Sequence, residues 1–270
     1  MADRKIGIIG AGGRMGQACI RQVTDTDGCT VVAASDVAGA ALIGQDAGDA
    51  AGAGNLGVAV TDDAAAVVAA SDAVIEFTLP APTVDHVALT AAAGVAHIIG
   101  TTGMEAAQEA ALKAAGEKTV IMHAPNMSLA VNLLFALTKQ VAATLNDDFD
   151  IEIFEMHHKH KVDAPSGTAV GMGRAAAEGR GVNLDDVAQW ARNGITGERK
   201  RGDIGFASLR GGNVIGDHTA TFAIEDERLE ISHKAQSRQI FARGAVHAAL
   251  WSAGKEPGFY TMFDVLGIEY

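Results

Sequence analysis

Hydrophobic residues in the first half of the chain form short runs that are apolar on both faces, and Ala-rich stretches separate these runs. Such runs are typical of strands buried on both sides of a parallel sheet, and the Ala-rich stretches favour helices. We predict strands over residues 5–10, 30–35, 73–77, 97–100 and 120–123, and helices over 14–25, 82–93 and 105–115. Strands that alternate with helices indicate an α/β domain built on a doubly wound parallel sheet. Residues 37–57 show little periodicity and are predicted as a surface loop with one turn of helix.

From residue 150 onward the segments become longer, and apolar and polar residues alternate along them. Alternation is typical of strands with one solvated face, so residues 150–158, 204–209, 214–223 and 228–234 predict a mixed or antiparallel sheet. A helix is predicted over residues 166–179, and a last Ala-rich helix over 239–253 is similar to those of the first half. We therefore expect one domain of residues 1–128 and 239–270, and a C-terminal α+β domain of residues 129–238.

Composition and charge narrow the classes of function. The chain of 270 residues is 48% hydrophobic and 20% charged, which is typical of a globular protein, and its apolar runs are too short to predict a membrane span. Its N-terminus lacks the features of a secretory signal, and Cys19 and Cys29, its two cysteines, are expected to be packing residues in a reducing compartment, the cytoplasm. The net charge of -12 argues against nucleic acid or an anionic membrane as a partner.

A glycine-rich turn follows the first predicted strand directly and leads into a helix. Gly10, Gly13 and Gly16 allow a sharp bend and a close approach of the backbone to a pyrophosphate, and Asp36 lies twenty residues beyond Gly16 at the end of the second strand. The spacing departs from G-x-G-x-x-G because Met15 stands at the third glycine position. A glycine-rich turn without a ligand is the alternative, but the order of strand, turn, helix, strand and acid favours a Rossmann-like dinucleotide site.

The residues beside Asp36 bear on the choice of cofactor. Val37 and Ala38 follow it, so a 2′-phosphate would meet a carboxylate and no neighbouring cation. We therefore predict that NADH is preferred and that NADPH use is possible, since Arg14 is able to reach either the pyrophosphate or a 2′-phosphate.

The segment from His157 to Lys161 consists of five residues that can all carry positive charge, in a chain that is strongly acidic. It admits three interpretations: a metal site, a solvated basic patch, or a segment that binds substrate and takes part in catalysis. Adjacent histidines in a strand point to opposite faces and two lysines oppose a cation, so no metal is predicted. The helix start that follows, with Ser166 as its expected N-cap, offers N–H groups and hydroxyls to an anion. The cationic segment and this helix start together favour the third interpretation, with a small substrate that has more than one carboxylate.

Several motifs carry a resemblance to a known family. The run EMHHKHKVDAPSGTA, together with GAGGRMG, FTLP, GTTG and APNM, resembles the 4-hydroxy-tetrahydrodipicolinate reductase (dihydrodipicolinate reductase) family. The similarity extends from the first strand to the final helix and includes TGER and GFASLRGGNVIGDHT. It implies an oxidoreductase that uses NAD(P)H to reduce a small cyclic dicarboxylate, 4-hydroxy-tetrahydrodipicolinate, to tetrahydrodipicolinate in lysine and diaminopimelate biosynthesis. It also implies a homotetramer, with substrate binding and oligomerisation in the C-terminal domain.

The same resemblance assigns roles to individual residues. His157 and Lys161 are the expected acid/base pair. The expected substrate-binding residues are His158, Lys161, Ser166, Gly167 and Thr168. The expected cofactor-binding residues are Gly10, Ala11, Gly12, Gly13, Arg14, Met15, Asp36, Gly100, Thr101, Thr102, Ala124, Pro125, Asn126 and Met127. The chain departs from the family at Val37 and Leu79, where many relatives carry basic residues, which bears on NADPH use rather than on the reaction.

Other titratable residues are assigned structural roles, and two other functions stay open. His218 and His233 are expected to be hydrogen-bonded residues of the second sheet, His86 to face solvent or packing, and Asp163 to pair with Lys161. The alternatives are another two-domain dehydrogenase, such as one acting on an amino-acid semialdehyde, and a non-catalytic dinucleotide-sensing protein. The cationic segment weighs against both.

Overall fold

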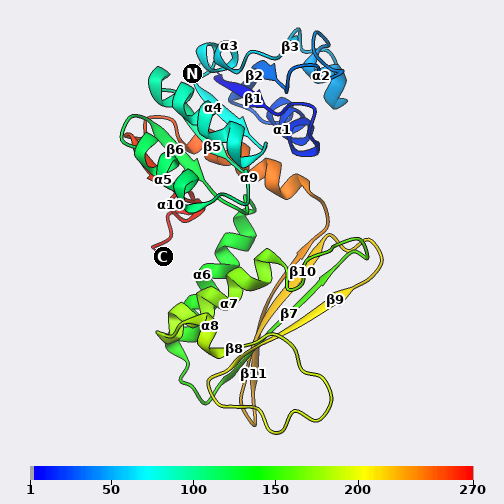
Figure 1. The fold of residues 1–270 in the computed structure, drawn as a ribbon, viewed down its shortest axis with the longest axis vertical. Coiled ribbons are helices and arrows are strands. Elements are labelled where there is room, and N and C mark those ends of the chain that lie inside the picture. Colours follow the sequence, from blue (N-terminus) through cyan, green and yellow to red (C-terminus); the bar gives the residue numbers. More distant parts are fainter. Residues whose placement is uncertain (1–2, 270) are drawn as a thin grey trace. The chain divides into compact units, whose positions relative to one another are not determined.

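The computed structural model describes residues 3–269, which divide into two compact units (Figure 1). The first unit comprises the chain up to Leu129 together with Gln239–Glu269, and the second comprises Ala130–Arg238. None of the helices within residues 3–269 is long and apolar enough to cross a membrane.

The first unit is built on a seven-stranded sheet in which all paired neighbours are parallel. Its strand order is β12-β6-β5-β4-β1-β2-β3. The bounds are β1 (Arg4–Ile9), β2 (Cys29–Ser35), β3 (Val60–Thr61), β4 (Ala73–Glu76), β5 (Ala96–Ile99), β6 (Val120–His123) and β12 (Gly258–Tyr260). From β1 the chain first adds β2 and β3 on one side of the sheet, and it later adds β4, β5, β6 and β12 on the other side. The carboxyl end of β1 is therefore the switch point at which such sheets bind ligands. The prediction of a doubly wound, Rossmann-like sheet is confirmed.

Helices cover both faces of this sheet because its strands are apolar on both. Ile6 and Ile8 of β1 pack in one core cluster with residues of α1 and α9, whereas Ile9 packs in another with Val67 of α3. The helices of this unit are α1 (Arg14–Thr24), α2 (Ala47–Ala51), α3 (Ala64–Ala70), α4 (Pro80–Ala93), α5 (Ala106–Ala115), α9 (Gln239–Trp251) and α10 (Met262–Leu266).

The second unit contains a five-stranded mixed sheet, which confirms the prediction of a mixed or antiparallel sheet, and its strand order is β11-β10-β7-β9-β8. Strand β10 is antiparallel to β7 and β11, and β9 is parallel to β7 and β8. The bounds are β7 (Asp150–His157), β8 (Ala188–Gln189), β9 (Ile204–Arg210), β10 (Gly216–Ala223) and β11 (Arg228–Ala235), with α6 (Leu129–Thr144), α7 (Gly167–Arg180) and α8 (Leu184–Val187). Alternate residues of β7 are buried, so Ile151 and Ile153 join the core cluster that contains Met172 of α7.

The structure contains elements that the sequence pattern does not predict. Helix α6 is apolar around much of its circumference, so periodicity does not distinguish it from other buried segments. Strand β12 completes the first sheet by pairing with β6. Within residues 37–57, the single predicted helical turn is α2, whose N-cap Asp46 accepts hydrogen bonds from the N–H groups of Gly48 and Asp49.

Candidate active site

The glycine-rich turn of the first unit lies at the carboxyl end of β1. Gly10 has a φ of 84°, and its N–H and that of Ala11 both donate to the Ser35 carbonyl at 2.9 Å. A Cβ at Gly16 would lie 2.0 Å from the Gly10 carbonyl oxygen, so only glycine lets α1 begin this close to the turn. Within the described residues, no side chain caps the N-terminus of α1. Its first N–H groups therefore point toward open space, where they fit a pyrophosphate.

Asp36 lies against this turn. Its Oδ2 accepts a hydrogen bond from the Gly12 N–H at 2.6 Å, and its Oδ1 accepts one from the Val37 N–H at 2.8 Å. A Cβ at Gly12 would come within 3.0 Å of the same carboxylate. The structure thus brings together the turn and the acid that the sequence places twenty residues further along the chain.

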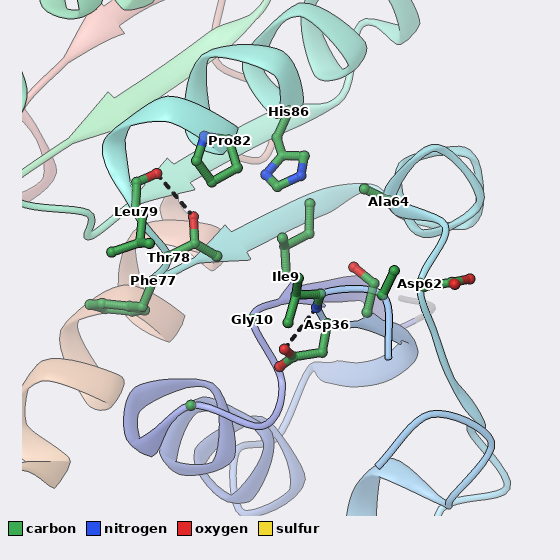
Figure 2. Close-up of a pocket in the computed structure, with 14 residues that line it drawn as sticks. Ile9, Gly10, Asp36, Asp62, Ala64, Phe77, Thr78, Leu79, Pro82 and His86 are labelled. Carbon is green, nitrogen blue, oxygen red and sulfur yellow. Dashed lines mark hydrogen bonds between the residues drawn. The ribbon is translucent and has the colours of Figure 1, made fainter. Parts of the chain in front are cut away.

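A cavity of about 460 Å³ opens beside Asp36 and the turn (Figure 2). Its volume and its mostly apolar wall suit the adenosine part of a dinucleotide. Val37 and Leu79 line it with side chains that are 73% and 71% exposed. The lining residues are Ile9, Gly10, Gly13, Ser35, Asp36, Val37, Ala38, Asp62, Ala64, Phe77, Thr78, Leu79, Pro82 and His86.

The residues expected at the nicotinamide end follow β5 and β6, which are adjacent strands, and they do not line this cavity. Thr101 is buried, and its Oγ1 accepts a hydrogen bond from the Thr78 N–H at 3.1 Å. A Cβ at Gly100 would lie 2.0 Å from the Phe77 ring, which packs directly on this glycine. Thr102 and Pro125 are exposed, Asn126 is half-buried, and Ala124 and Met127 are buried in the core.

A buried polar cluster, which the sequence pattern does not predict, adjoins the cavity through His86. The Glu76 carboxylate, at the end of β4, lies 2.8 Å from His86 Nδ1 and 2.9 Å from His97 Nε2, and it accepts a hydrogen bond from Thr83. Burial alone would raise the pKa of Glu76, but hydrogen bonds from His86 and His97 hold it well below its usual value. His86, expected to face solvent or packing, instead lines the cavity and contacts Glu76.

In the second unit, His157 is the last residue of β7 and is buried beside Glu155. Its Nδ1 lies 2.6 Å from Glu155 Oε2. The same carboxylate accepts two hydrogen bonds from Arg210 of β9, each 2.9 Å long. Glu155 and Arg210 were not predicted as site residues, although the spacing of Glu155 and His157 by two along a strand places both on one face.

His158 and Lys161 continue the cationic segment beyond β7. The Lys161 N–H donates to the His158 carbonyl at 3.1 Å, and Lys161 Nζ lies 2.7 Å from the nearer oxygen of Asp163, as expected for that pair. Burial lowers the pKa of His158, and the nearby positive charge of Arg238 lowers it further. In the part of the chain that the structure describes, no group of three or more His, Cys, Asp or Glu side chains is arranged to hold a metal.

Ser166 caps α7, as predicted, by accepting a hydrogen bond from the Ala169 N–H at 3.1 Å. Its Oγ also lies 3.0 Å from His218 Nε2, and its N–H donates to Glu155 Oε1 at 3.2 Å. Ser166 is therefore buried and hydrogen-bonded within this unit, whereas Gly167 is exposed and Thr168 half-buried at the start of α7. His218 is a hydrogen-bonded sheet residue, as expected, and burial lowers its pKa to about 3.

The chain matches two family models over nearly its whole length. The model "Dihydrodipicolinate reductase, N-terminus" matches residues 4–127, and the model "Dihydrodipicolinate reductase, C-terminus" matches residues 130–266. The chain belongs to the dihydrodipicolinate reductase family. It is 58% identical to the 4-hydroxy-tetrahydrodipicolinate reductase of Ruegeria pomeroyi over 97% of both chains, and 54% identical to that of Parvibaculum lavamentivorans over 99% of both. As a member of this family it is a dinucleotide-dependent oxidoreductase.

Two solved structures share the fold of this chain. A dipicolinate-bound dihydrodipicolinate reductase from Paenisporosarcina sp. superposes with a TM-score of 0.77 at 23% identity, covering 97% of this chain and 98% of that one. An amine dehydrogenase from Mycobacterium smegmatis shares the fold with a TM-score of 0.62 at 15% identity, covering 97% and 95%.

Proposed function

We propose that this chain reduces 4-hydroxy-tetrahydrodipicolinate to tetrahydrodipicolinate, with NADH as the preferred cofactor, in lysine and diaminopimelate biosynthesis. The observation that carries the proposal is the cationic segment His157–Lys161, which leads into the capped start of α7. This segment places positive charge between the buried His157 and the exposed Gly167 at the start of α7, in a chain whose relatives carry that reductase name.

The residues of this chain offer a group for each requirement of such a reduction. When bound, NADH would supply the hydride that the conjugated imine accepts. The Gly10–Gly13 turn and the uncapped start of α1 suit the pyrophosphate, and Asp36 suits the hydroxyls of the adenosine ribose. Lys161 and the start of α7 bind and orient the carboxylates of the substrate. His157 and Lys161 together supply the proton and stabilise the negative charge that develops on the substrate.

The preference for NADH is supported by the charges around the cavity of the first unit. Within residues 3–269 this cavity is lined by Asp36, Asp62 and His86 but by no lysine or arginine, and His86 contacts Glu76. Val37 and Leu79, where the family resemblance leads us to expect basic residues, present exposed apolar side chains here. A 2′-phosphate would therefore be repelled at this site, although Arg14 is exposed and leaves NADPH use possible.

The remaining expectations concern assembly and location. A homotetramer formed through the second unit is implied by the family resemblance, and sedimentation of the purified chain tests it. Cys19 and Cys29 are both free and buried, which supports a reducing compartment such as the cytoplasm.

A single assay tests the main proposal: the loss of NADH is followed on 4-hydroxy-tetrahydrodipicolinate that is formed freshly in the same cuvette. Rapid turnover of this compound and none of an amino-acid semialdehyde is the expected result. Cofactor binding without turnover of either compound would instead favour a dinucleotide-sensing protein. Turnover of the semialdehyde alone would favour another two-domain dehydrogenase.

A further inference from the structure

The buried carboxylate of Glu155 determines which nitrogen of His157 carries a fixed hydrogen. Glu155 is 1% exposed, and donor groups lie against both of its oxygens. Oε2 lies 2.6 Å from His157 Nδ1 and 2.9 Å from Arg210 Nη1, while Oε1 lies 2.9 Å from Arg210 Nη2 and 3.2 Å from the Ser166 N–H. An ionised carboxylate only accepts hydrogen bonds, so the hydrogen between Glu155 and His157 belongs to Nδ1.

The electrostatics of the cluster keep this carboxylate ionised. Burial by itself would raise the pKa of Glu155, but hydrogen bonds from Arg210 and His157 lower it below its usual value. The neighbouring ring of His218, whose centroid lies 5.1 Å from that of His157, has a pKa lowered to about 3 by burial and is therefore neutral at neutral pH.

The opposite nitrogen of His157 is left uncovered. A Cβ at Gly216, the first residue of β10, would lie 2.9 Å from His157 Nε2 and 3.4 Å from its Cδ2. Gly216 does not have a positive φ, so the requirement for glycine here is one of space. Among the described residues, Nε2 has no hydrogen-bond partner, although the His157 side chain is only 11% exposed.

We propose that Glu155, held by Arg210, is a positioning residue that keeps the hydrogen of His157 on Nδ1, so that Nε2 is the atom that delivers the proton. This inference rests on the proposed reductase function. In the reduction the Nε2–H bond breaks, and the proton goes to the substrate atom that carries the negative charge left by hydride addition. The imidazolium ring, which carries hydrogens on both nitrogens before the transfer, thereby becomes the neutral tautomer with its hydrogen on Nδ1, and an acid of the solvent returns a proton to Nε2 afterwards.

The proposal is tested by Glu155→Gln, with Glu152→Gln as a matched control. Glu152 lies on the opposite face of the same strand and also binds arginines, Arg192 and Arg199, but no ion pair joins it to a histidine among residues 3–269. We expect kcat of E155Q to fall by about 10- to 100-fold, the size of effect usual for residues that orient a ligand or catalytic histidine. The KM values for substrate and NADH should change little, and E152Q should keep the wild-type kcat.

Two further measurements separate positioning from a general loss of structure. Long-range nitrogen–proton NMR spectra, recorded at a pH where the ring is neutral, should show the hydrogen of His157 on Nδ1 in the wild type and a changed tautomer population in E155Q. In a His157→Gln background, Glu155→Gln should cause no further loss of kcat, because it acts only through His157. Wild-type kcat in E155Q, an additional loss in the H157Q background, or a wild-type spectrum with the hydrogen on Nε2 would each overturn the proposal.

Gly216→Ala tests the other half of the inference and leaves the Glu155 pair in place. Its methyl group would crowd Nε2, so kcat should fall while the NMR signature of Nδ1–H persists; wild-type kcat would refute the role of Nε2. Gly211→Ala is the control, because its Cβ would meet only the flexible end of Met156. This variant and the wild-type spectrum decide the question even if E155Q does not fold. An inactive wild type would refute the proposed function, whereas the spectrum tests the Glu155 contact without turnover.

Discussion

The Asp36 carboxylate is the group that we expect to discriminate between the two nicotinamide dinucleotides, and Asp36→Asn tests this. Asparagine keeps an oxygen able to accept the Gly12 N–H, which Asp36 binds at 2.6 Å, so the turn should stay folded. What changes is the negative charge beside the position expected for the 2′ substituent of the adenosine ribose. The variant should therefore lose activity with NADH and gain activity with NADPH.

Two contributions determine how much Asp36→Asn changes the preference for NADH over NADPH. For NADH, the variant loses the charge-assisted part of a hydrogen bond from a ribose hydroxyl, which is worth about 1.5 kcal/mol. For NADPH, it removes a repulsion that amounts to about 1 to 4 kcal/mol for charges about 4 Å apart near a protein surface. Because Asp36 is half-buried beside an open cavity, solvent reduces this to about 1 to 2 kcal/mol. The sum of the two contributions is about 3 kcal/mol. It corresponds to an increase of about 100-fold in the ratio of kcat/KM for NADPH to kcat/KM for NADH.

The assay measures kcat/KM for NADH and for NADPH in the wild type, in D36N and in D85N. Asp85 is an exposed carboxylate of α4 that does not line the cavity, so D85N removes the same charge without changing the ratio. A wild type that prefers NADPH would contradict the charge argument at once. So would a ratio in D36N that equals the ratio in D85N.

Three other changes have defined outcomes. Gly16→Ala places a Cβ 2.0 Å from the Gly10 carbonyl oxygen, so thermal melts should show a loss of about 1–3 kcal/mol or more, and unchanged stability would show that the turn adapts. Lys161→Ala should raise the KM for substrate and lower kcat, because a charge-assisted contact of about 1.5–3 kcal/mol is lost; steady-state kinetics that show neither effect would remove Lys161 from the site. The pKa of His218, lowered by burial from 6.5 to about 3, means that the unfolded chain binds a proton at higher pH than the folded chain does. The stability that this contributes is present above about pH 6.5 and is lost as the pH falls toward 3, so urea denaturation of His218→Asn should show a flatter pH dependence in that range.

The sequence predicts those parts of the site whose residues are close together along the chain, because their local structure depends on neighbouring residues. β1, the glycine turn and α1 are contiguous, and the capping of α7 by Ser166 is a local rule of spacing and side-chain chemistry. Asp36 is further away, but it follows the next strand of the same parallel sheet, so its place beside the turn follows from topology.

The parts that the sequence does not predict depend on pairs of residues that only tertiary structure brings together. His97 of β5 and His86 of α4 both contact Glu76. Their separations from Glu76 along the chain match no helical or strand spacing that would predict a contact. Arg210 reaches Glu155 because β7 and β9 are parallel neighbours with His157 opposite Arg210, which is a matter of register. The burial of the Ser166 hydroxyl has the same origin, since its partner His218 comes from β10.

Glu76 and Glu155 share one physical principle, which explains why each unit buries a carboxylate near the end of a strand. A buried ion is costly unless several donors surround it, and removing one partner typically costs about 3–5 kcal/mol. Each of these carboxylates is therefore a strong constraint on the segments that supply its donors. Glu76 holds Thr83 and His86 of α4, of which His86 lines the cavity beside Asp36, and Glu155 holds the start of α7 through Ser166 and the ring of His157. Charged contacts thus tie the first turns of α4 to the end of β4, and the start of α7 to the end of β7.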